Sequence, residues 1–139
     1  MLQIRRLRFK AILLGVLADT IGTLTVATAL FLAMAAAGIP EAEITVRMRG
    51  FSGLMLMLIL GLSFTLIGGY VAGRTAGRLE ILHGAIVAGT GLVLGLFFRE
   101  PGLPLWYETV SFAAMVPVGM AGGSLAREGN VKRMLAGKE

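Results

Sequence analysis

The chain has 139 residues, of which 56% are apolar and 15% are charged, and its net charge is +5 at neutral pH. Soluble domains carry roughly 25% charged residues, so a water-soluble core of this size is excluded and lipid is the expected solvent. The basic residues lie in short clusters beside long apolar runs, which argues against nucleic acid as a partner, and the lack of cysteine excludes disulfides and thiolate chemistry.

Four stretches are long enough and apolar enough to cross a bilayer as helices. A helix rises about 1.5 Å per residue, so a hydrocarbon core of about 30 Å needs about 18 or more nearly uncharged residues. The first run, between Lys10 and Glu41, contains one charge, Asp19, and the other three runs contain none. We therefore predict a single all-α domain over residues 1–139, an up-down-up-down bundle with spans at about 11–36, 51–73, 81–98 and 106–126.

The first span begins like a secretory signal peptide. Basic residues precede the apolar run, and the small residues Ala35 and Ala37 offer a cleavage site. The apolar stretch is far longer than the roughly 7–15 residues of a signal sequence. We expect an uncleaved membrane helix.

Lysine and arginine are divided unevenly between the two sides of the predicted bundle. The side with both termini and the 74–80 loop carries ten of them: Arg5, Arg6, Arg8, Lys10, Arg74, Arg78, Arg127, Lys132, Arg133 and Lys138. The other side carries Arg47, Arg49 and Arg99. Because basic loops stay in the cytoplasm, we expect a multi-pass protein of a bacterial cytoplasmic (inner) membrane with both termini inside. Trp106 and Tyr107 fit an outer aromatic belt, and Tyr70 fits an inner one.

Glycine recurs at four-residue spacing within the spans. The residues are Gly69, Gly73, Gly77, Gly91, Gly95, Gly119 and Gly123, with Ala29, Ala33 and Ala37 as an alanine version. This spacing places small residues on one helix face, where backbones approach closely in lipid. It predicts helix packing inside the bundle, with a dimer interface as the alternative. Leu58 is expected on a lipid-facing side.

Pro117 lies inside the last predicted span. Its ring removes one backbone donor, so it should kink the helix and leave the carbonyl of Ala113 without its helical partner.

The second and fourth predicted spans end alike. Residues 68–74 read Gly-Gly-Tyr-Val-Ala-Gly-Arg and residues 122–127 read Gly-Gly-Ser-Leu-Ala-Arg. Two hairpins of the same orientation would form a parallel internal repeat. Convergent packing chemistry explains the pattern equally well, and both interpretations stay open.

Asp19 is the one charged residue inside a predicted span. It lies about eight residues into the helix, roughly 12 Å from the inner edge, where a charged carboxylate costs at least about 2.5–3.5 kcal/mol. It should therefore face a partner or water, or be protonated. We interpret Asp19, with Thr23 on its helix face, as an ion-coupling site or as a buried polar group bonded to a hydroxyl such as Thr65, Ser63 or Ser111.

His83 is the only histidine and lies near the start of the third span. Zinc needs four ligands and the sequence offers no others nearby, so we expect no metal. The ring is either a hydrogen-bonded interfacial group or part of a pH-sensitive gate with Glu80, on the same helix face, and Arg78.

The sequence carries no hydrolase, metalloprotease or phosphate-loop motif and no carboxylate pair at catalytic spacing. We expect no enzyme, no catalytic residue and no cofactor. The leading hypothesis is a non-enzymatic membrane component that packs, docks or self-associates, with the lipid bilayer, a second copy or a larger membrane protein as partner. The alternative is a small proton-coupled transporter that uses Asp19.

Two resemblances rest on these motifs. The Gly-Gly-Tyr-x-Ala-x-Arg motif of residues 68–74, the His-Gly-Ala of residues 83–85 and the Asp-x-x-Gly-Thr of residues 19–23 resemble a family of four-helix bacterial inner-membrane proteins without an assigned activity. That resemblance implies the four-helix topology. Residues 19–23, Asp-Thr-Ile-Gly-Thr, are also similar to the first helix of small multidrug resistance transporters, which carry Glu in place of Asp. That likeness implies a proton and cation site at Asp19.

Overall fold

The computed structural model describes residues 7–136, which form five helices and no strand. They are α1 (Phe9–Ala36), α2 (Glu41–Arg49), α3 (Phe51–Ala76), α4 (Glu80–Phe97) and α5 (Leu105–Ala136). Helices α1, α3, α4 and α5 are each long and apolar enough to cross a membrane. The protein is an all-α integral membrane bundle, so the predicted fold class is confirmed.

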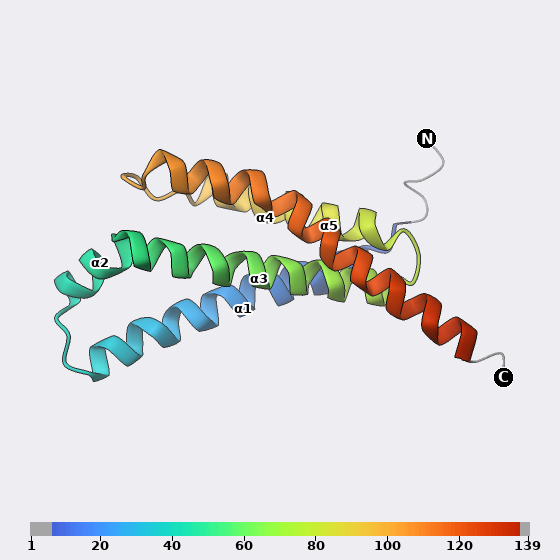
Figure 1. The fold of residues 1–139 in the computed structure, drawn as a ribbon, viewed down its shortest axis with the longest axis horizontal. Coiled ribbons are helices and arrows are strands. Elements are labelled where there is room, and N and C mark those ends of the chain that lie inside the picture. Colours follow the sequence, from blue (N-terminus) through green and yellow to red (C-terminus); the bar gives the residue numbers. More distant parts are fainter. Residues whose placement is uncertain (1–6, 137–139) are drawn as a thin grey trace.

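The four long helices run up, down, up and down (Figure 1). At one end α1 begins, α3 turns into α4 and α5 finishes; we call this the basic end, because it carries Arg8, Arg74, Arg78 and Arg127. The opposite end holds α2 and the 98–104 loop, and we call it the α2 end. Arg5, Arg6 and Lys138, which the orientation argument counts, lie outside the described residues.

The helix bounds depart from the predicted spans mainly at two places. Helix α5 continues to Ala136, well past residue 126, because its polar last turns still favour helix after the apolar stretch ends. The connection between α1 and α3 contains α2, which the sequence analysis did not predict. Pro40 directly precedes α2, and an Arg47–Glu43 pair at 2.6 Å, one turn apart, supports the helix.

Helix α5 carries Pro117 in its interior and bends near its middle, as Figure 1 shows. A proline at this position cannot donate to the carbonyl of Ala113, which accounts for a bend without a break.

Helices α3, α4 and α5 pack against one another through glycines. A Cβ atom at Gly69 or Gly84 would collide with the backbone of Gly119, and one at Gly122 would collide with the backbone of Leu66. A Cβ at Gly73 would lie 2.8 Å from that of Ala126. These backbones can approach closely only because the side chains are absent.

Other predicted packing residues take different places. Gly123 meets the backbone of Glu80, and Gly95 lies against the ring of Phe112. Gly77 touches no other helix; it is the left-handed C-cap of α3, with φ of 64°. The alanine series Ala29, Ala33 and Ala37 is exposed. Leu58, expected against lipid, is instead buried between the helices.

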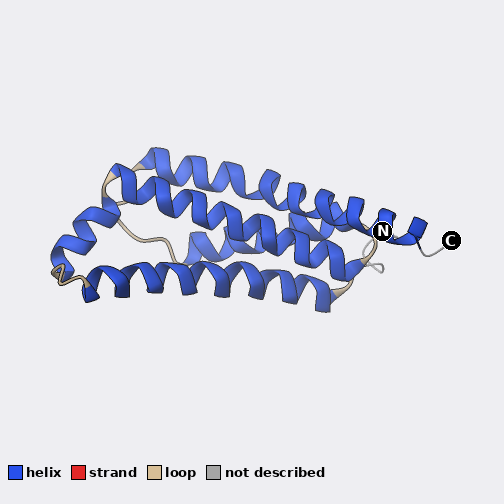
Figure 2. Ribbon diagram, turned by 60° about the horizontal axis from the view of Figure 1, so that its bottom comes forward, coloured by secondary structure: helices blue, strands red, loops and turns tan. Residues whose placement is uncertain are grey.

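Helix α1 packs against α3 and α4 and makes no contact with α5 among the described residues. Its buried residues are Ala11, Gly15 and Asp19, all in its first half. In Figure 2 it follows one edge of the bundle, and its α2 end stands away from the other helices. The bundle is therefore closed towards the basic end and open towards the α2 end.

Candidate functional site: a carboxyl group at the base of a central cavity

A cavity of about 520 Å³ lies in the open half of the bundle. All four long helices contribute to its wall, which consists of Asp19, Thr20, Thr23, Leu24, Met57, Leu58, Gly61, Leu62, Thr65, Gly91, Leu94, Gly95, Phe98, Tyr107, Ser111 and Met115. The wall is mostly apolar, and Asp19 is its one ionisable carboxyl group. Binding pockets for small molecules typically enclose about 300–1,000 Å³ and combine apolar walls with few polar groups.

Asp19 lies at the place where the closed and open halves meet, with only 8% of its surface exposed. The hydroxyl oxygen of Thr65 on α3 is 3.3 Å from its Oδ1 and 3.4 Å from its Oδ2. Thr65 was one of three hydroxyl partners that the sequence suggested. Asp19 and Thr23 are one turn apart on α1 and line the same wall.

The Thr65 hydroxyl can respond to the protonation of Asp19. It also lies 3.1 Å from the carbonyl oxygen of Gly61, and a hydroxyl has one proton to donate. When Asp19 is ionised, Thr65 donates to the carboxylate. When Asp19 is protonated, its hydroxyl can donate to the Thr65 oxygen while Thr65 donates to the carbonyl of Gly61. Both protonation states of Asp19 therefore leave no buried polar atom of this group without a hydrogen-bond partner.

Glycines make room for this carboxyl group. A Cβ at Gly68 would lie 2.9 Å from the Cβ of Asp19, and one at Gly91 would lie 3.3 Å from its Oδ2. Gly91 therefore serves the cavity as well as the packing of α4 that its spacing suggested.

The wall of the cavity extends to side chains on the outer surface of the bundle. These side chains include Leu24 of α1, which is 61% exposed, Leu94 of α4, and Phe98, the residue that follows α4; the last two are also exposed. The cavity is therefore partly open to the surroundings of the bundle.

The other predicted hydroxyl partners do not reach Asp19. Ser111 lines the cavity, but its hydroxyl donates to the carbonyl of Tyr107 at 2.6 Å. Ser63 is exposed and donates to the carbonyl of Ile59 at 2.7 Å.

His83 lies at the basic end and is completely buried. Its Nδ1 is 2.9 Å from the carbonyl oxygen of Leu79, and its Nε2 is 3.1 Å from the backbone nitrogen of Arg8. A carbonyl only accepts and a backbone N–H only donates, so Nδ1 carries the proton and Nε2 accepts. His83 thus joins the start of α1 to α4. The sequence suggested a hydrogen-bonded ring but not this partner, because the donor is a backbone group.

The predicted group of His83, Glu80 and Arg78 does not come together. Glu80 Oε1 accepts from Asn130 Nδ2 at 3.0 Å, and Arg74 donates to Asn130 Oδ1 at 3.1 Å. Within residues 7–136, no hydrogen bond or salt bridge joins His83 to Glu80 or Arg78. Asn130, on α5, is the centre of this cluster.

At the α2 end, Arg99 forms a two-pronged ion pair with Glu108. Both contacts are 2.5 Å, and Glu108 is buried although Arg99 is exposed. The hydrogen bonds and the attraction to Glu108 raise the pKa of Arg99 above its usual value. The pair anchors the 98–104 loop to the first turn of α5, next to the cavity residues Phe98 and Tyr107.

In the part of the chain that the structure describes, no three His, Asp or Glu residues lie close enough to hold a metal ion. A search of known protein families, of curated proteins and of solved structures finds no match to the chain.

Proposed function

We propose that this integral membrane protein is a small carrier that binds a lipophilic cation in the central cavity and exchanges it for a proton on Asp19. One observation carries the proposal, namely that a cavity of about 520 Å³ reaches a carboxyl group buried among four membrane-spanning helices. An intramembrane carboxyl group without an ion pair is costly, and such groups typically mark ion or substrate pathways.

The chemistry of the wall suggests the class of ligand. Leucine, methionine and phenylalanine side chains favour an apolar body, and the single carboxyl group favours one positive charge. Thr65 can stabilise Asp19 in either protonation state. A proton and a cation would therefore compete for one site, which is the minimal requirement for coupled exchange.

The first test is binding to purified protein, with trimethyl(1-adamantyl)ammonium as the probe and the uncharged 1-adamantanol as its matched control. We expect calorimetry to detect the cation in wild type, with weaker binding of the alcohol. Asp19→Asn should fold normally and lose the preference for the cation.

The second part of this test uses a variant whose added side chain fills the cavity. Gly61 lines it and Gly89 does not, yet a Cβ at either position would meet nothing within 4 Å. Gly61→Leu should abolish binding of both probes, whereas Gly89→Leu should bind like wild type. In proteoliposomes, uptake of the cation should release protons in wild type and not in Asp19→Asn.

If wild type binds neither probe, the carrier proposal is overturned. The packing or self-associating component then becomes the better interpretation. The exposed second half of α1, with its series Ala29, Ala33 and Ala37, supports that second candidate, because small residues let a helix of another copy approach closely.

A further inference from the structure

A second hollow lies on the opposite part of the molecule, between α4 and α5 at the basic end. It is a groove of about 540 Å³ whose wall includes Leu82, Ala85, Met120 and Arg127. It shares no residue with the Asp19 cavity. Leu82 and Met120 are partly exposed although they belong to membrane-spanning helices, so the groove faces lipid.

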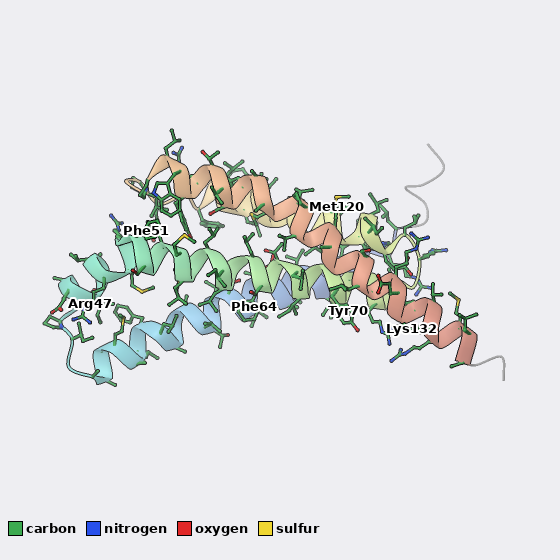
Figure 3. The ribbon with its side chains drawn as sticks, in the orientation of Figure 1. Arg47, Phe51, Phe64, Tyr70, Met120 and Lys132 are labelled. Atoms are coloured by element: carbon green, nitrogen blue, oxygen red, sulfur yellow. The ribbon has the colours of Figure 1, made fainter. Side chains whose placement is uncertain are left out.

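The groove is apolar along its length and positive at its end. Met120 and Arg127 are seven residues apart on α5, which is two helical turns or about 10 Å. Figure 3 labels Met120 in the middle part of α5 and Lys132 near its end, and Arg127 lies between them in the sequence. The arginine thus lies two turns nearer the end of the helix than the methionine, a spacing that suits a lipid headgroup at Arg127 and an acyl chain beside Met120.

Two arginines at this end are available for an anion. Among residues 7–136, no salt bridge or side-chain hydrogen bond involves Arg127 or Arg78, and Arg78 directly precedes the groove residue Leu79. The groove also contains an acid, Glu80, but its Oε1 is occupied by Asn130, which Arg74 contacts in turn.

We propose that this groove binds one anionic phospholipid, with the phosphate at Arg127 and an acyl chain along Leu82, Ala85 and Met120. Charge complementarity selects the headgroup, and the apolar length of the groove selects a lipid over a soluble phosphate. Each lysine or arginine near a membrane surface raises the affinity of a basic segment for anionic lipids about fivefold.

The test is native mass spectrometry of the purified protein from micelles that contain equal amounts of phosphatidylglycerol and phosphatidylcholine. We expect wild type to retain one phosphatidylglycerol in preference to phosphatidylcholine. Arg127→Gln should lower this preference about fivefold, whereas Lys132→Gln, on the same helix and outside the groove, should leave it unchanged. Arg127→Lys should keep it, which separates charge from folding.

A second pair of variants tests the groove itself. Ala85→Leu should reduce the retention of both lipids, and Gly89→Leu, one turn further along α4, should not. Equal retention of the two lipids by wild type would overturn the proposal, as would equal losses in Arg127→Gln and Lys132→Gln. Displacement of the lipid by millimolar glycerol phosphate would also overturn it, because the site would then recognise a soluble anion.

Discussion

Between the basic end and Asp19 the helices meet through glycine backbones, whereas from Asp19 to α2 the same helices surround a cavity. The difference lies in where the glycines point: Gly69, Gly119 and Gly122 face another backbone, but Gly61 faces empty space. A glycine in a membrane helix can therefore either let two backbones touch or leave a cavity unfilled.

The largest expected effect comes from adding one methyl group at a glycine of the closed half. Gly122→Ala would press its Cβ against the backbone of Leu66, which cannot move without separating α3 from α5. We expect a loss of more than about 3 kcal/mol, or failure to fold, because overpacking typically costs about 1–3 kcal/mol even where side chains can adjust.

The matched variant is Gly61→Ala, which should leave stability unchanged or raise it by up to about 1 kcal/mol through helix propensity. Unfolding in mixed detergent measures both. Equal stability of the two variants would mean that the closed half is not held by glycine contacts.

A smaller effect is expected at the α2 end, where the ion pairs of the described residues lie. Arg99→Ala leaves the buried Glu108 without its partner, and we expect a clear loss of stability, smaller than that of Gly122→Ala because Arg99 is exposed. Arg47→Ala removes an exposed pair within α2 and should cost about 0.5 kcal/mol or less. Thermal unfolding at low and high salt distinguishes them, and the ranking would be contradicted if both variants lost the same stability.

The last contrast concerns the hydroxyl of Thr65, where the two halves meet. Thr65→Val preserves shape but removes the partner of Asp19, so we expect a loss of about 1 kcal/mol. Ser63→Ala, on the exposed face of the same helix, should change stability by less than about 0.5 kcal/mol. The same unfolding measurement serves for both, and an unchanged Thr65→Val would argue against the contact with Asp19.

The sequence predicted those features that depend on charge and length. The spans followed from uncharged runs, and Asp19 was identified because a carboxyl group inside such a run is exceptional. Thr65 appeared only as one of three hydroxyls, since spacing along α3 does not reveal which one faces α1.

The remaining features depend on how the helices are placed. Whether Gly61 faces a void or a neighbour depends on the divergence of α1, which no local pattern encodes. The contact of His83 with Arg8 uses a backbone donor that every residue has. Helix α2 was missed because it is short and charged, although Pro40 before it and the Glu43–Arg47 spacing are readable as helix signals.

The separation of α1 from α5 also bears on biosynthesis. Helices emerge from the ribosome in chain order, so α1 enters the bilayer while Thr65, 46 residues later, is still unavailable. During that interval Asp19 has no hydroxyl to accept from, and a charged carboxylate in the bilayer costs at least about 2.5–3.5 kcal/mol. Helix α1 contacts α3 and α4 but not α5, so Asp19 can reach its hydroxyl partner as soon as α3 has entered the bilayer, before α5 has been synthesised, and the residue at the centre of the cavity waits in lipid only over that interval.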